Sequence, residues 1–418
     1  MVVVENRSRK ASLDAPIAFH VPHRAPGELS NLARVLEGRG PARGGTFAEA
    51  CEALLIARLD VPVHLTHSAT AALEVAAMAL DLGPGDEVVV PSFTFCATAT
   101  AFRRAGARIV LCDVDPHTLM AGPREVAKAM SARTKAVVAV HYGGAVADLA
   151  GLAALCERHG AVLVEDAAQA LGSSRGGIAA GTRGRFAAFS FHRTKVAQCG
   201  TGGALVVRDG CDRRTVQRIL DRGTDASEAL PRGRPYRWVR DGSSFRPSEL
   251  QAAQLEAQLR DLDRNLALRR RLATHYRRLF AAHGARLPVA PVDLPPGCEG
   301  NDHLFATLAP QAGEAERLRA AVAGRGIACP FHYVPLHVSP MGRRMGYAPS
   351  DLPVSANVWQ RVVRLPLHTA MDENDVERVV AALLAVARSP QRPKMCAPSM
   401  APVLPITARS ERRERSLS

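Results

Sequence analysis

The sequence has no long apolar run. Among its 418 residues we find no stretch of about 18 consecutive apolar residues, so we expect no transmembrane helix. The apolar start, MVVV, is too short for a secretory signal, and a cytoplasmic protein is expected. Because 47% of the residues are hydrophobic, the chain can bury a large core and is expected to form two or three domains.

The sequence also lacks closely spaced cysteines, and it has few lysines. The nine cysteines are odd in number and widely spaced, and no CxxC or Cys/His metal pattern occurs. We therefore expect reduced thiols and no metal site. The chain has five lysines, at positions 10, 128, 135, 195 and 394. This scarcity leaves few candidates for any reaction that needs a lysine amine.

The positive charge lacks the pattern of a nucleic-acid surface. The net charge is +14, which by itself favours nucleic-acid binding. From Arg388 onward, however, seven basic residues stand against two acidic ones. Elsewhere the basic residues are scattered, without a continuous stripe interleaved with aromatics. We therefore expect no nucleic-acid partner and no membrane partner.

Short apolar segments alternate with helical ones between about residue 46 and residue 208. The predicted strands are 87–90, 107–113, 135–141, 161–165, 187–191 and 203–208. The predicted helices between them are 70–82, 97–105, 122–132 and 148–159. Nearly continuous apolar strands separated by helices are typical of an α/β fold, with a mostly parallel sheet covered on both faces.

The rest of the chain predicts a smaller second domain. A helical stretch over 247–281, which begins after Pro247, leads into an α+β region that ends in a helix at 373–387. We predict a loose leader at 1–15, a large domain at 16–262 and a small domain at 263–388. Residues 389–418 contain five prolines followed by mixed charges, and we expect them to be disordered.

Ionisable residues follow several of the predicted strands, where open parallel sheets bind ligands. Asp166 follows AVLVE, His141 ends KAVVAVH, and Lys195 lies just beyond AAFSF. Ser68 and Thr70 stand at the start of a helix, where an anion is favoured. A lysine, a carboxylate and an anion site suggest pyridoxal 5′-phosphate (PLP). Spacing alone leaves the structural alternative open, because a strand-end Asp is often a cap and a Lys is often solvated.

Local motifs are more specific. EDAAQA at 165–170, FSFHRTK at 189–195 and GTGG at 200–203 resemble the core of the DegT/DnrJ/StrS sugar aminotransferases. Matching segments at 68–73, 91–95, 248–253 and 332–337 extend the resemblance over about residues 16–388. The resemblance implies the aspartate-aminotransferase type of PLP fold, with a large domain and a smaller α+β domain. It also implies a homodimer with active sites at the subunit interface.

The resemblance assigns roles around the cofactor ring. Lys195 would form the Schiff base and, once released, move the proton between substrate and cofactor. Asp166 would pair with the pyridinium nitrogen and keep the ring cationic. Gln169 would lie near the 3-hydroxyl group, and Phe95 would stack on the ring.

The remaining assignments concern the phosphate and the sugar. Ser190 would hold the phosphate together with the hydroxyl group of Thr70 and the backbone at Ala69 and Thr70. Tyr333 and His337 match the small-domain loop that lines the sugar site in the family.

The implied substrate is a nucleotide-linked sugar. Residues 222–225 and 236–244 resemble the branch of the family that makes TDP-4-amino-4,6-dideoxygalactose. The expected reaction moves the amino group of L-glutamate to the keto group, at C4, of a nucleotide-linked 4-keto-6-deoxyhexose. Two alternatives stay open: a 3-keto sugar or cyclitol ketone as acceptor in antibiotic biosynthesis, or a regulatory protein that binds PLP without turnover. The presence of Lys195 favours transamination.

Three residues depart from the family pattern. Val196 stands where Asn is common, Thr201 replaces the glutamate of GEGG, and Pro247 stands where many members have Met. None of them is a cofactor-bonding group. For His141 and His192, a structural role and a role at the site both stay open.

Overall fold

The computed structural model describes residues 15–41 and 44–388. The leader expected at 1–15, apart from Ala15, and the tail expected at 389–418 lie outside the described residues. None of the described helices combines the length and the apolar character of a membrane span. Eight of the nine cysteines fall in the described part, and all eight are free thiols there.

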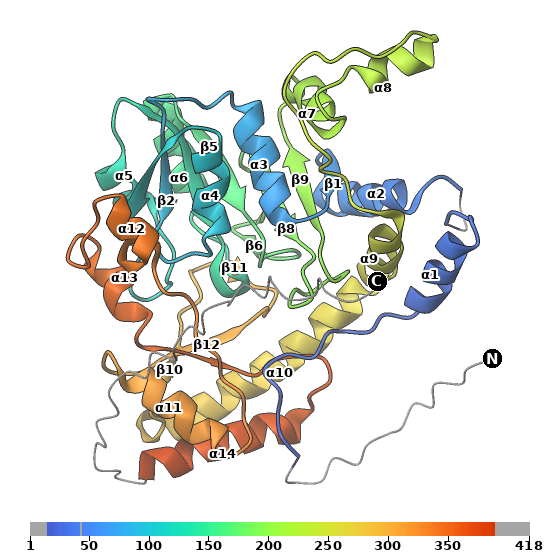
Figure 1. Ribbon diagram of the computed structural model, residues 1–418. Helices are drawn as coiled ribbons and strands as arrows, with labels where there is room; N and C mark the ends of the chain where they lie inside the picture. The colour runs from blue at the N-terminus through green and yellow to red at the C-terminus, as the bar shows by residue number, and fades with distance from the viewer. Residues whose placement is uncertain (1–14, 42–43, 389–418) are drawn as a thin grey trace, which may run out of the picture.

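A seven-stranded sheet forms the centre of the larger part (Figure 1). From edge to edge its strands are β1 (Val63–Thr66), β9 (Gly203–Val207), β8 (Phe186–Ser190), β5 (Val162–Asp166), β4 (Thr134–Val140), β2 (Glu87–Pro91) and β3 (Arg108–Cys112). The five strands from β8 to β3 run parallel, and β9 is antiparallel to both of its neighbours. The predicted mostly parallel sheet is therefore confirmed.

Helices cover both faces of the sheet because its strands are apolar on both sides. Val88 and Val90 of β2 lie in the same core as the helices α3 (Ala69–Ala79), α4 (Ala97–Arg104) and α7 (Asp212–Leu220). Val89, between them, points to the opposite face. The helices there are α2 (Phe47–Leu59), α5 (Pro123–Ala129), α6 (Leu149–His159) and α9 (Glu249–Arg260). Successive residues of one strand thus belong to two different cores.

The stretch expected as one helical run at 247–281 consists of two helices. Ser248 caps α9 through a reciprocal pair of hydrogen bonds with Gln251, so Pro247 precedes the cap instead of lying in the first turn. The chain bends at Asp261 and continues as α10 (Leu262–His283).

A second, smaller core lies around α10. The helices α11 (Glu314–Ala323) and α14 (Glu373–Arg388) accompany the antiparallel sheet β10 (Ala290–Pro291), β12 (Phe305–Leu308) and β13 (Val362–Leu365). Along α10, Leu266 belongs to the core of the large sheet, whereas Leu272 belongs to the small core. Ile17 joins the small core too, bonded through its backbone to Gly326 and Ala328. The domain limits proposed from the sequence stay a prediction.

The remaining elements are short. They are α1 (Glu28–Leu36), β6 (Ser174–Arg175), β7 (Ile178–Ala179), α8 (Ala226–Ala229), β11 (Cys298–Glu299), α12 (Pro340–Arg344), α13 (Pro353–Val358), and short 3₁₀ turns at Tyr142–Gly144, Leu230–Arg232, Gly284–Arg286 and Leu336–Val338. The helix α8 belongs to a segment, 221–246, that extends away from the sheet beyond α7 (Figure 1). We call this segment the arm.

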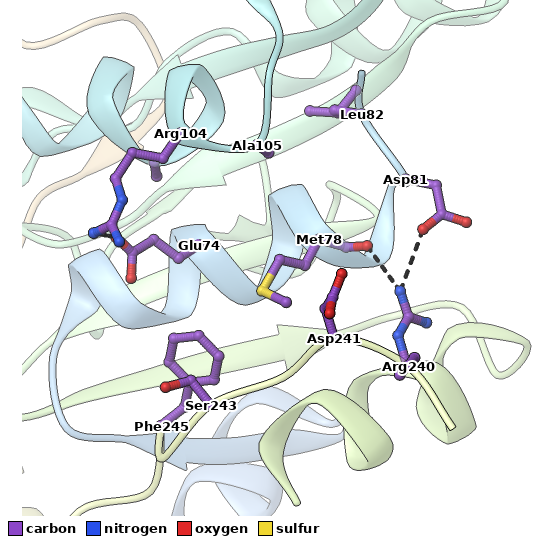
Figure 2. A pocket seen from close by; sticks show the side chains of 11 residues that line it. Glu74, Met78, Asp81, Leu82, Arg104, Ala105, Arg240, Asp241, Ser243 and Phe245 are labelled. Carbon is purple, nitrogen blue, oxygen red and sulfur yellow. Dashed lines mark hydrogen bonds and ion pairs between the residues drawn. The ribbon is translucent and has the colours of Figure 1, made fainter. Parts of the chain in front are cut away.

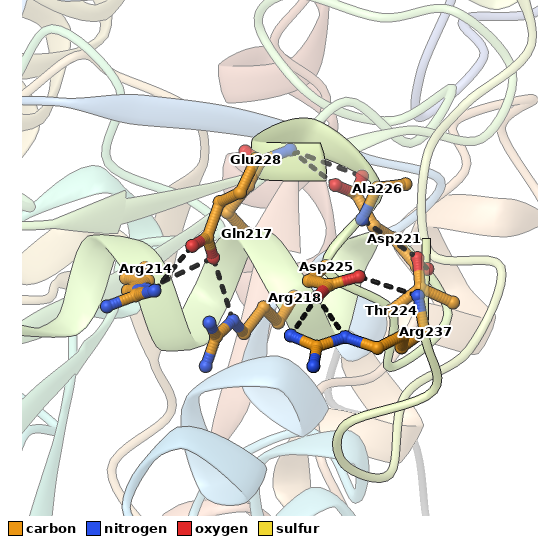
Figure 3. Close-up of polar contacts among 9 residues, drawn as sticks. All are labelled: Arg214, Gln217, Arg218, Asp221, Thr224, Asp225, Ala226, Glu228 and Arg237. Carbon is orange, nitrogen blue, oxygen red and sulfur yellow. Dashed lines mark hydrogen bonds and ion pairs between the residues drawn. The ribbon is translucent and has the colours of Figure 1, made fainter. Parts of the chain in front are cut away.

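Ion pairs hold the arm in shape (Figure 3). The guanidinium of Arg237 donates to the carboxylate of Asp225 at 3.0 and 3.1 Å. Arg214 and Arg218, both on α7, donate to Glu228 of α8. These hydrogen bonds lower the pKa of Glu228 to about 2. The arm therefore has a defined shape although it projects from the core.

Candidate active site

A cavity of about 590 Å³ lies at the carboxyl ends of β4, β5 and β8. Of the nine residues assigned to the site from the sequence, eight line it: Ala69, Thr70, Phe95, Asp166, Gln169, Ser190, Lys195 and Tyr333. These residues come from five separate segments of the chain. The parallel strands and the start of α3 bring them to one place.

Lys195 reaches the cavity from the turn after β8. Its backbone N–H donates to the carbonyl of His192 at 2.8 Å, which fixes this turn. Burial lowers the pKa of Lys195 to about 8, although the nearby carboxylate of Asp166 opposes the shift and Arg364 adds to it. A lysine with this pKa is partly neutral near pH 7, as a nucleophilic amine must be.

Asp166 is held in one orientation. Thr98 of α4 donates its hydroxyl hydrogen to Oδ2 at 2.7 Å, and the backbone N–H of Ala168 donates to Oδ1 at 3.2 Å. The hydroxyl group of Thr94 lies 2.9 Å from that of Thr98 and continues the chain of hydrogen bonds. The carboxylate thus faces the cavity with both oxygens anchored.

The start of α3 fits an anion. Ser68 caps the helix by accepting the N–H of Ala71 at 3.1 Å, and Ser190 lines the cavity opposite this first turn. Gly203, paired with Ser190 across the sheet, lies so close that a Cβ there would be 2.3 Å from the backbone carbon of Ser68. The close approach sets β8 and β9 against the helix N-terminus, which favours a phosphate. These residues fit the phosphate group of PLP.

Aromatic side chains form the other wall. Tyr333 accepts a hydrogen bond from Nε2 of Gln169 at 2.9 Å and stacks on His332 at 3.7 Å between ring centroids. Phe95 lies 6.1 Å from Tyr333 and is 56% exposed. Its free ring face is available to a flat ligand, in agreement with a pyridine ring between Phe95 and the sheet.

The structure separates His337 from the other assigned residues. It is fully buried, its Nδ1 lies 2.6 Å from the hydroxyl oxygen of Ser92, and its backbone N–H donates to the same oxygen at 3.1 Å. It does not line the cavity. This corrects the expectation that it faces a sugar: the side chain ties the loop after Tyr333 to the end of β2.

The structure also shows where His141 and His192 lie. Both ring nitrogens of His141 are engaged, Nε2 with Glu165 at 2.9 Å and Nδ1 with the N–H of Ala147 at 3.1 Å. His141 is therefore a structural residue of the cavity wall. His192 is exposed at the cavity rim, with Nδ1 3.0 Å from the hydroxyl group of Thr194.

Some contributors were not identified from the sequence. Thr98, which anchors Asp166, lies in a predicted helix but has no motif of its own. His332 and Arg364 also come from outside the expected set, and both flank Lys195. A search for polar residues in the first turn of the helix after Pro91 would have found Thr98. For Arg364 we see no sequence signal, since it is one of many arginines.

A separate hollow, of about 780 Å³, lies between α3, α4 and the base of the arm (Figure 2). Four of its five charged groups form pairs: Arg104 with Glu74 at 2.8 Å, and Arg240 with Asp81 at 3.3 Å. Arg240 also donates to the carbonyl of Met78 at 3.1 Å. The contacts fasten the arm to α3, and we assign no chemistry to this hollow.

Comparison with known proteins identifies the family. A model of the DegT/DnrJ/EryC1/StrS aminotransferase family matches residues 26–384. The chain belongs to this family. It is therefore an aminotransferase of the PLP-dependent type, as the motifs around Asp166 and Lys195 implied.

The chain is also similar to individual proteins and to a solved structure. The chain is 35% identical over 378 residues to a dTDP-4-dehydro-2,3,6-trideoxy-D-glucose 4-aminotransferase of Saccharopolyspora spinosa, covering 87% of this chain and 94% of the relative. It is 34% identical over 311 residues to a pleiotropic regulatory protein of Geobacillus stearothermophilus, covering 74% and 80%. The crystal structure of the aminotransferase TlmJ from Streptoalloteichus hindustanus superposes with a TM-score of 0.79 at 30% identity, covering 88% and 98%.

A buried carboxylate next to Asp166 provides a test of this geometry. Burial opposes ionisation of Glu165, but hydrogen bonds from His141, Gly184 and Gly181 hold its pKa below the usual value. We predict that Glu165→Gln lowers the free energy of unfolding by about 3 kcal/mol, because its amide hydrogens would face N–H donors. Urea unfolding followed by circular dichroism measures this loss.

The control for this measurement is Glu157→Gln. Glu157 is exposed and pairs with Arg183 on the surface, so its loss is expected to cost less than about 1 kcal/mol. Equal losses in the two variants would contradict the role given to Glu165.

The contribution of ionised Glu165 to stability depends on pH. It is fully present above the ordinary pKa of a carboxyl group, and it is lost as the pH falls through the lowered pKa that Glu165 has in the folded protein.

Proposed function

We propose that this protein transfers the amino group of L-glutamate to the C4 keto group of a nucleotide-linked 4-keto-6-deoxyhexose. The observation that carries the proposal is the meeting of Lys195, Asp166 and the α3 anion site in one cavity. The relative named as a 4-aminotransferase of a dTDP-linked keto sugar supports the choice of C4. The cytoplasmic location expected from the sequence stays a prediction.

We infer the following roles for the charged residues. Bound PLP supplies an electron sink for breaking the C–H bond next to the transferred amine. Lys195, with its lowered pKa, would attach the cofactor and later hold the proton that moves. Asp166, fixed by Thr98, would keep the pyridine nitrogen protonated. Both oxygens of the Asp166 carboxylate are hydrogen-bonded, which supports this role, because a carboxylate that changed orientation would lose its contact with the pyridine nitrogen.

The neutral residues would position the cofactor. The first-turn N–H groups of Ala69 and Thr70, with the hydroxyl groups of Thr70 and Ser190, suit the phosphate. The exposed face of Phe95 suits stacking on the ring. Gln169, oriented by the N–H of Gly143 at 2.8 Å and by Tyr333, suits the 3-hydroxyl group. Tyr333 would then place its ring against the sugar.

We also propose a homodimer in which the arm contacts a second copy. The arm exposes Leu230, Tyr236, Trp238 and Val239, and Trp238 is 77% exposed. Exposed aromatic residues of this kind are typical of interface cores. The ion pairs that fix the arm lower the entropy cost of such a contact.

Two other functions compete. The same chemistry on a 3-keto sugar or a cyclitol ketone would use the same Lys195 and Asp166. A regulatory protein that binds PLP without turnover is the second, and the similarity to a protein named as a pleiotropic regulator favours considering it. The next two experiments separate these functions.

Acceptor choice is tested with L-glutamate and a panel of ketones. We expect amination of a TDP-linked 4-keto-6-deoxyhexose at least tenfold faster than that of a 3-keto sugar nucleotide or a cyclitol ketone. Mass spectrometry detects the amine, and NMR locates it on the ring. Faster reaction of either other ketone would support the first alternative, and no reaction of glutamate even without acceptor would support the regulatory one.

Cofactor capture is tested with cofactor-free protein. Because Lys195 reacts as the neutral amine, the rate of PLP uptake is expected to rise with pH and level off above about 8, whereas an ordinary lysine would need a pH above about 10. Lys195→Ala should abolish the absorption band of lysine-bound PLP. The exposed Lys128→Ala serves as control and should keep it. A band that survives in Lys195→Ala would refute the assignment.

The arm contact is tested by sedimentation. Trp238→Ser together with Tyr236→Ser is expected to raise the dimer dissociation constant roughly 30-fold or more, as the loss of two aromatic anchors does at interfaces. Arg234→Ser, an exposed neighbour on the same arm, should leave it unchanged. An unchanged dimer in the double variant would place the interface elsewhere.

A further inference from the structure

Lys195 lies in a turn whose carbonyl groups are held from outside the large sheet. We call residues 192–196 the lysine turn. The carbonyl of Val196, the residue after the lysine, accepts a hydrogen bond from Nδ2 of Asn265 at 2.6 Å. Oδ1 of the same amide accepts from Nε of Arg269 at 3.0 Å. Since a guanidinium only donates, the Asn265 amide is fixed in one orientation, with its N–H groups towards the turn.

Asn265 and Arg269 connect the lysine turn to the small core. Both are 1% exposed and lie on α10, which runs from the large sheet into the small core (Figure 1). Nη1 of Arg269 donates to the carbonyl of Leu367, just after β13, at 3.0 Å and to that of His303, just before β12, at 3.4 Å. The carbonyl of Val196 is thereby joined through two buried side chains to the chain next to β12 and β13.

The N-terminal segment provides a second contact with the turn. Nε2 of His20 lies 2.7 Å from the carbonyl of Arg193, and because a carbonyl oxygen only accepts, this nitrogen carries the hydrogen. Two residues earlier, the carbonyl of Ala18 accepts from Nε2 of His368 at 3.0 Å, and Ile17 packs in the small core. His20 therefore extends from the small core to the turn, independently of α10.

We propose that His20 and Asn265 are positioning residues of Lys195, which hold its turn from the small core. The inference rests on the proposed function, in which the amine of Lys195 attaches the cofactor. The two held carbonyls lie two residues before the lysine and one residue after it, so the backbone of Lys195 is fixed on both sides. A fixed backbone keeps the amine within reach of the cofactor, and a shift of about 1 Å at a reacting group can lower a rate roughly 100-fold.

The first test measures how fast cofactor-free protein binds PLP at Lys195. The amine adds to the aldehyde of PLP with loss of water, and borohydride then reduces the new C=N bond by adding hydride to carbon and a proton to nitrogen. Mass spectrometry locates the trapped cofactor among the five lysines of the chain. Above about pH 9 the amine is mostly neutral, because its pKa is lowered to about 8, so the limiting rate depends on where the amine lies.

Two variants remove the donors and keep an apolar side chain in their place. In His20→Phe and in Asn265→Leu the limiting rate should fall roughly tenfold or more. The pH at which the rate levels off should stay the same, because the charges around Lys195 are unchanged. His20→Gln should recover most of the rate, since its side-chain amide can donate to the same carbonyl. Thr307→Val is the matched control, because it removes another buried hydrogen bond of the small core, to the carbonyl of Val363 at 2.8 Å.

Amide hydrogen exchange gives a measurement that needs no cofactor. The backbone N–H of Lys195 donates to the carbonyl of His192 at 2.8 Å within the turn. In His20→Phe and in Asn265→Leu this N–H should exchange about tenfold faster or more than in the wild type, because the turn opens more often. Thr307→Val should leave this exchange unchanged.

Several results would overturn the inference. Unchanged limiting rates in both donor variants, or an equal fall in Thr307→Val, would contradict it, as would unchanged exchange at Lys195. A shift of the pH at which the rate levels off, without a lower limiting rate, would mean that the variants change the pKa of the amine and not its position. If Asn265→Leu fails to fold, His20→Phe and His20→Gln still decide, since equal rates in these two variants would refute the hydrogen bond.

The trapping experiment also separates this inference from the proposed function. A wild type that binds PLP at Lys195, with donor variants that bind it equally fast, refutes this inference alone. A wild type that never binds PLP at Lys195 refutes the proposed function and this inference with it.

Discussion

The buried carboxylate of Glu165 is the contact on which the site's geometry depends. It accepts backbone N–H groups of Gly181, Arg183 and Gly184 at 2.6 to 2.8 Å and the ring of His141 at 2.9 Å. These bonds tie the end of β5 to the loop before β8 and to the end of β4. The ends of β5 and β4 are thereby fixed relative to the start of β8, and the ends of β5 and β4 carry residues of the cavity. The position of Asp166 follows directly from that of its neighbour.

Two groups of opposite charge lie near Lys195. On one side lies Asp166, which favours the ammonium form, and on the other lies Arg364, which disfavours it. Burial decides the balance and lowers the pKa. The lysine therefore lies between a carboxylate and a guanidinium, an arrangement suited to the proposed transfer of a proton between substrate and cofactor.

Six of the seven strands were predictable from local composition, whereas β1 was not predicted. The eight cavity residues were predictable from the motifs that resemble the family. Apolar strands are recognised by their composition; Asp166 and Ser190 end such strands, and Lys195 lies in the turn that follows one. His337 was misplaced because its motif gives no information on which way the side chain points, and its partner, Ser92, is far away in the sequence.

Thr98 and Arg364 were missed for the same physical reason. Each acts through a partner brought near by the tertiary fold: Asp166 for Thr98, and the 330–331 carbonyls for Arg364. The bend at Asp261 was missed because the residues on both sides of it favour a helix.

The small core can be completed only late in synthesis, because it joins both ends of the described chain. It contains Ile17 from the start of the described chain and Leu383 from its end. During synthesis the large sheet, complete by Val207, has all its strands available while the small core still lacks its final helix. The last helix of this core, α14, thus emerges last, and the segment carrying Phe19 and His20 can settle beside Arg364 only after the small core closes.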